Sequence, residues 1–156
     1  MALLITRIIN LGLQTVVVSV TFGAWLQLSP ALLSFDGPTY AQVQQRVLHG
    51  LKRFMPFVLL LALISMILDG VLIEHEGAVP FDFTLAAAVF FITFLYITIR
   101  YELPINADIE HWSAANPPPD WEAKRRQWEK WQTVRAWLSV AVLFSLIGAS
   151  LGSGGC

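Results

Sequence analysis

The sequence predicts an all-α membrane protein: a four-transmembrane-helix bundle with an amphipathic helix in the first cytoplasmic connection and a long fourth helix that extends into the cytoplasm. Of the 156 residues, 56% are apolar and 13% carry a charge, whereas a soluble domain is about 45–50% apolar and about 25% charged. The mean hydropathy is +0.61. Four apolar runs are each about as long as a helix needs to cross a bilayer.

Charge and cysteine content exclude several classes of function. Ten Lys and Arg residues face eleven Asp and Glu residues, so the formal net charge is -1. Nucleic-acid binding requires an excess of basic residues, and we expect no nucleic-acid partner. Cys156 is the single cysteine, which excludes an internal disulfide, and no CxxC or HExxH spacing offers a zinc site.

The sequence predicts a single membrane domain, residues 1–151, that contains all four spans. They cover about residues 8–35, 54–73, 83–101 and 131–151. Pro30 is expected to kink or end the first span, and Pro56 is expected in the first turn of the second, where proline is tolerated. Asp69 is expected at the membrane interface rather than in a proton relay. The Gly-rich residues 152–156 are expected to form a flexible tail.

The basic residues predict the orientation of the bundle. Nine of the ten Lys and Arg residues lie in or beside the two longer connections, and Arg7 alone lies on the opposite side. Basic residues concentrate on the cytoplasmic side of membrane proteins. We therefore expect cytoplasmic long connections and both termini outside, in the inner or plasma membrane of a bacterium, with the acidic turn at residues 74–76 also outside.

The first connection is predicted to contain an amphipathic helix that leads into the second span. After the turn signal Asp36-Gly37-Pro38, apolar residues recur at spacings of three and four: Tyr40, Val43, Val47, Leu51 and Phe54. The other face carries Gln42, Gln45, Arg46, His49 and Arg53. This polar face either meets water, the usual arrangement, or lines a shared cavity.

The second connection is predicted to interrupt the helices. A residue before proline is disfavoured in helical geometry, so the third helix is expected to end near Tyr101 or Glu102, ahead of Leu103-Pro104. Asn106 is then expected to cap a short turn through His111 and Trp112.

The last helix is predicted to run from Trp121 to the Gly-rich tail. Asn116-Pro117-Pro118-Pro119 forms a stiff spacer, and Asp120 is a candidate N-cap. A helix of about 31 residues is about 46 Å long, more than the roughly 30 Å of the hydrocarbon core. Trp121, Trp128 and Trp131 share one side of it and are expected to pack on the mouth of the bundle or lie at headgroup depth.

Acidic residues, one amide and one histidine gather where the third span meets the cytoplasm: Glu102, Asn106, Asp108, Glu110 and His111. Asp108 and His111 are three residues apart and can meet on one helical face, as metal ligands do. A metal site needs a third ligand, such as His49 or Glu102. A hydrated acidic surface is the more common arrangement, so no metal is predicted.

Polar residues also lie within the predicted spans. Arg135, beside Gln132, either extends to the headgroups or points inward, pairs with Glu102 and faces a ligand pocket. Gln14 and Gln27 are expected to form hydrogen bonds to other helices and, less often, to bind a ligand.

Four segments carry a resemblance to a known family. They are Ser29-Pro30-Ala31-Leu32-Leu33, Gln45-Arg46, Leu103-Pro104-Ile105-Asn106, and Trp128-xx-Trp131-Gln132-xx-Arg135. In this order they resemble the anthrone oxygenase-like family of small four-helix membrane proteins. The resemblance extends over nearly the whole chain. It implies relatives that are largely uncharacterised, whose named members oxidise anthrones to anthraquinones with dioxygen and need no obvious metal, so no cofactor is expected.

The resemblance implies a reaction in which the substrate supplies the electrons. An anthrone deprotonates to an electron-rich enolate that reduces dioxygen directly, so the protein supplies a base, an apolar pocket and a cation. We expect Glu102 or His49 to be the base and Arg135 the cation. The residues expected to bind substrate are Asn106, which would orient the substrate oxygen, and Gln132, Trp128, Trp131 and Gln27.

One position departs from the family pattern. Many relatives carry His where this chain has Gln132, and a Gln side chain is no general base near neutral pH. If that His is the family's base, this member is inactive or differently specialised.

A second class of function stays open, in which the protein is a noncatalytic membrane accessory subunit or binds a lipid or quinone. A transporter is less favoured, because four spans would have to oligomerise to form a pathway and the sequence suggests no intramembrane ion pair. The expected partners are membrane lipid, a small aromatic or quinone-like ligand, and a second copy of the chain in a homo-oligomer. The oxygenase hypothesis depends on Glu102, Asn106, Gln132 and Arg135 converging on one cavity.

Overall fold

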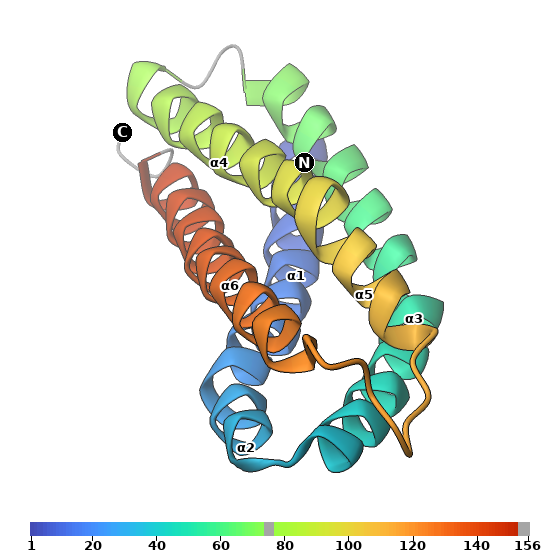
Figure 1. The fold of residues 1–156 in the computed structure, drawn as a ribbon. Coiled ribbons are helices and arrows are strands. Elements are labelled where there is room, and N and C mark those ends of the chain that lie inside the picture. Colours follow the sequence, from blue (N-terminus) through green and yellow to red (C-terminus); the bar gives the residue numbers. More distant parts are fainter. Residues whose placement is uncertain (74–76, 153–156) are drawn as a thin grey trace.

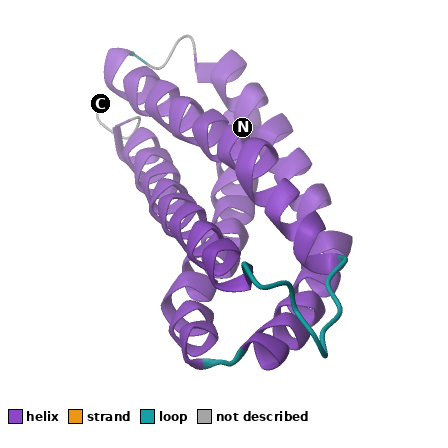
Figure 2. Cartoon of the chain, in the orientation of Figure 1, coloured by secondary structure: helices purple, strands orange, loops and turns teal. Residues whose placement is uncertain are grey.

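The computed structural model describes residues 1–73 and 77–152 (Figure 1). All regular structure in these residues is helical (Figure 2), which confirms the predicted fold class. Four helical stretches of this part are long and apolar enough to cross a membrane: Ala2–Ser34, Gly37–Leu72, Ala78–Glu110 and Trp121–Gly152. The chain is therefore an integral membrane protein. The predicted acidic turn at 74–76, and the predicted tail beyond Gly152, lie outside the described residues.

The first crossing consists of three helical segments: α1 (Ala2–Gly23), the π-helical turn η1 (Ala24–Leu28) and α2 (Ser29–Ser34). The third crossing repeats this pattern: α4 (Ala78–Ile97), the π-helical turn η3 (Thr98–Glu102) and α5 (Leu103–Glu110). In both crossings the second residue after the π turn is a proline. Both crossings therefore continue past a residue that usually ends or kinks a helix.

The π turns explain why these prolines do not end their helices. The backbone N–H of Ser29 donates to the carbonyl of Ala24, and that of Leu103 donates to the carbonyl of Thr98, five residues back in each case. A proline ring collides with the carbonyl four residues back in a regular α-helix. The wider π turn relieves that collision. The prediction that the third helix ends near Tyr101 or Glu102 is therefore wrong.

Asn106 and Pro56 also lie elsewhere in their helices than predicted. Asn106 lies within α5 rather than at a cap. The predicted amphipathic helix and the second span form one continuous helix, α3 (Gly37–Leu72), so Pro56 lies in its interior and not in a first turn.

At the start of α3 the Asp36 carboxylate accepts a hydrogen bond from the Thr39 backbone N–H at 3.0 Å. Hydrogen bonding by Thr39 lowers the pKa of Asp36.

The last crossing is a single helix, α6 (Trp121–Gly152) of 32 residues, which confirms the predicted long rod. It packs along α4 and also against α1, and α1 packs on α3. In contrast, α3 and α4 touch each other little. The beginning of α1 and the last described turns of α6 lie at one end of the bundle, and α2 and α5 lie at the other (Figure 1).

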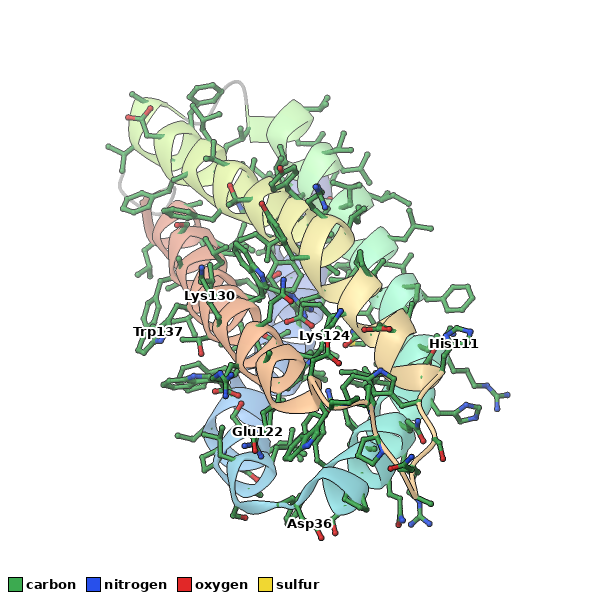
Figure 3. All side chains as sticks on the ribbon, in the orientation of Figure 1. Asp36, His111, Glu122, Lys124, Lys130 and Trp137 are labelled. Atoms are coloured by element: carbon green, nitrogen blue, oxygen red, sulfur yellow. The ribbon has the colours of Figure 1, made fainter. Side chains whose placement is uncertain are left out.

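Two buried clusters hold the bundle together. The cluster in the membrane-spanning middle contains Val17, Val58, Ala62, Met66, Ala87, Phe91, Phe94, Val142 and Leu146. The cluster at the α2 and α5 end contains Leu32, Tyr40, Leu48, Ile105, Ile109 and Trp128, with Trp121 and Trp131 packed against it. Trp121, Trp128 and Trp131 of α6 thus pack on the mouth of the bundle. Large apolar side chains also project outward from α3 and α4 (Figure 3), as a lipid-facing surface requires.

Polar side chains inside the bundle join the crossings. The Gln14 amide donates to the Ser139 carbonyl at 3.0 Å, which confirms its expected interhelical role. The Ser65 hydroxyl donates to the Asn10 amide oxygen at 3.2 Å. Asp69 is buried, and its carboxylate lies 3.7 Å from the Arg7 guanidinium. An ion pair between crossings thus holds Asp69 inside the bundle, and its expected depth at the membrane interface stays a prediction.

Candidate functional site

A cavity of about 560 Å³ lies at the α2 and α5 end of the membrane-spanning region. Its walls come from α1 and η1, the first two thirds of α3, the end of α4 with η3 and α5, and α6. Ligand pockets for small molecules are about 300–1,000 Å³ in volume and mostly apolar. The wall fits that description over much of its area, with apolar side chains that include Val20, Leu48, Leu51, Met55, Leu59 and Leu95.

A buried ion pair forms the most polar part of the wall. Nη1 of Arg135 lies 3.2 Å from Oε2 of Glu102. The exposed fraction of the side chain is 11% for Arg135 and 1% for Glu102. Of the two arrangements considered for Arg135, the structure has the inward one. The same nitrogen donates to Oε1 of Gln132 at 3.3 Å, and the guanidinium carbon lies 4.8 Å from the centre of the Phe94 ring.

Helical spacing brings the α6 residues of the site to one face. Trp128, Gln132 and Arg135 are three and four residues apart, and such positions are neighbours on a helix. The Gln132 amide donates to the Thr21 carbonyl at 2.8 Å, which ties α6 to α1. The Trp128 indole N–H donates to Oδ1 of Asn106 at 3.1 Å, which ties α6 to α5. These hydrogen bonds fix the orientation of the wall around Arg135.

The π turn η3 ends at Glu102 and so positions the carboxylate of the pair. Oε2 of Glu102 contacts Arg135, while Oε1 has no hydrogen-bond partner in the part of the chain that the structure describes. A carboxylate oxygen without a partner can accept a proton. The neighbouring guanidinium can stabilise negative charge that develops beside it.

The cavity thus brings together five of the eight predicted site residues: Glu102, Asn106, Trp128, Gln132 and Arg135. The other three lie outside its wall. His49 is exposed beside Gln42 and Arg46 in a shallow depression on α3. Gln27 is exposed on η1. The Trp131 ring stacks on the Tyr101 ring, with centroids 3.9 Å apart.

The acidic residues beyond the cavity form ion pairs and surface contacts. Asp108 lies 2.8 Å from Lys124 Nζ. Nδ1 of His111 lies 2.6 Å from the Ala107 carbonyl oxygen, on the exposed end of α5 (Figure 3). Over residues 1–73 and 77–152, no three His, Cys, Asp or Glu side chains are grouped as a metal site requires. Asp108 pairs with Lys124 and His111 contacts the Ala107 carbonyl, and neither belongs to a group of three candidate metal ligands in the described residues.

Two features of the cavity wall were not predicted from the sequence. Gln44 is completely buried and lines the cavity, although it stands on α3 between the apolar positions Tyr40 and Leu48. A glutamine among apolar positions of an amphipathic helix was the available signal. The second feature is an ion pair, 2.8 Å long, between Lys52 of α3 and Glu110 of α5, both of which line the cavity. All four charged residues of the wall are thus paired, two positive with two negative.

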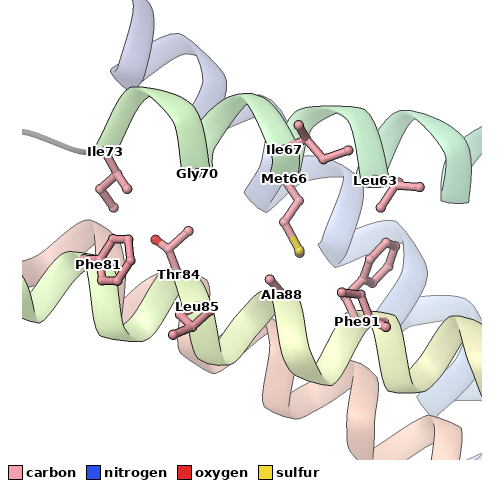
Figure 4. A pocket seen from close by; sticks show the side chains of 11 residues that line it. Leu63, Met66, Ile67, Gly70, Ile73, Phe81, Thr84, Leu85, Ala88 and Phe91 are labelled. Carbon is pink, nitrogen blue, oxygen red and sulfur yellow. The ribbon is translucent and has the colours of Figure 1, made fainter.

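A second, smaller pocket of about 220 Å³ lies between α3 and α4 nearer the other end (Figure 4). Met66 and Ile67 of α3, with Ile73 just after its end, face Thr84 and Ala88 of α4 across it. Apart from the Thr84 hydroxyl its lining is apolar. The residues that line this pocket include no acid or base, whereas those that line the larger cavity include both.

Comparison with known proteins identifies the family. A family model described as anthrone oxygenase matches residues 45–145, well over half of the chain. The matched region includes Glu102, Asn106, Gln132 and Arg135, and it begins directly after Gln44. No curated protein and no solved structure matches the chain.

Proposed function

The chain belongs to the anthrone oxygenase family, as its sequence resemblance implied, and we propose that it is a cofactor-independent oxygenase of a small electron-rich aromatic or quinol-like compound. The observation that carries this proposal is the buried Glu102–Arg135 pair in the wall of an apolar cavity. The pair combines an acceptor for a proton with a fixed positive charge, and the apolar wall suits a flat aromatic ligand.

In the proposed reaction Glu102 starts the chemistry as the base. Oε1 takes a proton from the activated CH₂ carbon of the substrate, and the electron pair of that C–H bond forms an enolate. Arg135 stabilises the enolate oxygen and the anions that follow it. The enolate transfers one electron to dioxygen, and the resulting radical and superoxide combine through a new C–O bond.

Loss of water completes the proposed reaction. The peroxide takes the proton back from Glu102, so the carbon then carries one hydrogen and an OOH group. Removal of that hydrogen as a proton, with cleavage of the O–O bond, leaves a carbonyl group and one molecule of water. One CH₂ group and one dioxygen are thus converted into one C=O group and one water, and the substrate itself supplies all the electrons.

Gln132 has a positioning role in this proposal. Its side chain carries no group that takes up a proton near neutral pH. Its amide nitrogen binds the Thr21 carbonyl and its amide oxygen binds Arg135. The base is therefore assigned to Glu102, and Gln132 holds the cation in place.

The first prediction tests this assignment with purified protein, anthrone and dioxygen. Glu102→Gln and Arg135→Ala are each expected to lower kcat by about 10²–10⁴-fold, the contribution of a general base or of a positioned charge. Quinone absorbance and oxygen uptake measure the rate. His49→Ala is the matched control for the base, because His49 is exposed and lies outside the cavity wall.

Two outcomes would contradict the proposal. Wild-type protein that is no faster than spontaneous oxidation would remove the oxygenase function. Loss of activity in His49→Ala with retention in Glu102→Gln would place the base on His49.

A noncatalytic role as a quinone-binding protein is the second candidate. It is favoured by the buried polar atoms of the cavity that have no hydrogen-bond partner among the described residues, since these suit a bound ligand whether or not it reacts. Saturable binding of anthraquinone without turnover of anthrone would support it.

A further inference from the structure

Gln44 differs from the other buried glutamines of the bundle. Gln14 and Gln132 each donate a hydrogen bond to a backbone carbonyl of another helix. The Gln44 side chain is also fully buried, yet neither its amide nitrogen nor its amide oxygen has a hydrogen-bond partner among residues 1–73 and 77–152. Burial of an amide with both ends unsatisfied lowers stability, so such a residue is rare in a native protein unless something else binds it.

The position of Gln44 indicates what binds it. Gln44 lines the same cavity as the Glu102–Arg135 pair, but from α3 rather than from η3 and α6. Its sequence neighbour Gln45 donates to the carbonyls of Ile109 and Trp112 at 2.9 and 3.0 Å and so connects α3 to the end of α5. Gln45 thus forms the hydrogen bonds between α3 and the end of α5, whereas the Gln44 amide lies in the cavity wall and is available to a ligand.

The charges of the wall indicate the chemistry of the ligand. Arg135 pairs with Glu102, and Lys52 pairs with Glu110, so the wall carries no net charge. A neutral amide offers one acceptor and two donor hydrogens. The acceptor and donors of the amide match a hydroxyl group, or a hydroxyl beside a carbonyl. A wall without net charge suits a ligand that is itself uncharged.

We propose that Gln44 is a specificity-determining residue that binds a neutral hydroxyl group of the ligand at a second point in the cavity, away from the Glu102–Arg135 pair. This inference rests on the proposed function only for the identity of the reacting group. Gln44 lines the cavity near the start of α3, and Leu59 lines it 15 residues further along the same helix, about 22 Å away at 1.5 Å per residue. The bound ligand therefore directs its hydroxyl toward the connections and its apolar body toward Leu59 and Leu95.

The second prediction separates ligand binding from turnover by use of quinones, which are not oxidised further. Anthraquinone and 1,8-dihydroxyanthraquinone are titrated into the protein, and quenching of tryptophan fluorescence reports binding because Trp128 lines the cavity. Gln44→Met, which is nearly isosteric, is expected to raise the Kd of the dihydroxy compound about tenfold, the value of one or two neutral hydrogen bonds. The Kd of anthraquinone is expected to change less than twofold.

Gln42→Met is the matched control, because Gln42 is exposed on the same helix and lies outside the cavity wall. It is expected to change neither Kd. The melting temperature gives an independent readout, since Gln44→Met removes a buried unsatisfied amide and is expected to raise it. Gln44→Leu serves as a second variant and is expected to show the same loss of discrimination.

Three results would overturn the inference. Equal weakening of both quinones would show that Gln44 only shapes the cavity. Unchanged binding of the dihydroxy compound would show that Gln44 does not contact it. A fall in melting temperature together with preserved discrimination would show a structural role. All three are measured by binding and unfolding, so they stay distinct from a failure of the proposed oxygenase activity.

Discussion

Arg7 and Asp69 form a second buried ion pair, at the opposite end of the bundle from the cavity. The guanidinium Nε and the carboxylate oxygen are 3.7 Å apart, and the exposed fractions of the side chains are 9% and 1%. The pair links the first turns of α1 to the last turns of α3. A buried charge is costly without its counter-ion, so the two residues depend on each other.

The third prediction concerns this pair. Arg7→Met is expected to lower the free energy of unfolding by about 3–5 kcal/mol, because it leaves the Asp69 charge buried without its partner. The double variant Arg7→Met/Asp69→Leu is expected to recover most of that loss. Thermal unfolding in detergent, followed by circular dichroism, measures both. A double variant that is less stable than the single one would show that the pair is not the source of the effect.

Specific contacts hold the connections between the crossings in place. Nη1 of Arg125 donates to the carbonyls of Leu32 and Phe35 at 3.1 Å each, and so caps the C-terminal end of α2 from α6. The spacer before α6 packs on the start of α3, where a side chain at Gly37 would place its Cβ 2.8 Å from Cγ of Pro117 and 3.0 Å from the Trp121 ring. Only a residue without a side chain fits between these groups.

The fourth prediction tests this close contact. Gly37→Ala is expected to destabilise the protein by about 1–3 kcal/mol, because the added methyl group overlaps a rigid proline ring. Gly50→Ala is the matched control on the same helix. A Cβ at Gly50 has no neighbour within 4 Å in the part of the chain that the structure describes, so this variant is expected to be neutral or more stable by up to about 1 kcal/mol. Equal effects of the two variants would contradict the packing of Pro117 on α3.

The arrangement of the four crossings fixes which ends of the chain share a side of the membrane. The beginning of α1 and the end of α6 lie together, and the α2 to α3 and α5 to α6 connections lie together at the other end (Figure 1). The distribution of basic residues predicts that the connections are cytoplasmic.

The fifth prediction tests that orientation in intact cells with a membrane-impermeant maleimide. The native Cys156 is expected to react from outside. A Ser113→Cys variant in a Cys156→Ser background is expected to react only after the membrane is permeabilised, since Ser113 lies exposed in the α5 to α6 connection. The reverse pattern would contradict the predicted orientation, and access from one side to both cysteines would contradict the hairpin topology.

Composition and periodicity were sufficient to predict four apolar helices and the single long last helix. They were also sufficient to group Trp128, Gln132 and Arg135, because residues three and four apart always share a helical face. These features depend on short-range geometry. The family match agrees with the resemblance drawn from the same local motifs.

Tertiary packing decided the remaining features. Rules for single residues predicted that Leu103-Pro104 ends a helix, but a π turn packed beside the cavity accommodates the proline and positions Glu102. His49 and Gln44 both stand on α3, and only the packing of the other helices around α3 leaves His49 exposed and buries Gln44. The sequence determined which residues share a face of each helix, whereas the tertiary structure decided which faces meet, because that choice depends on contacts between residues far apart in the chain.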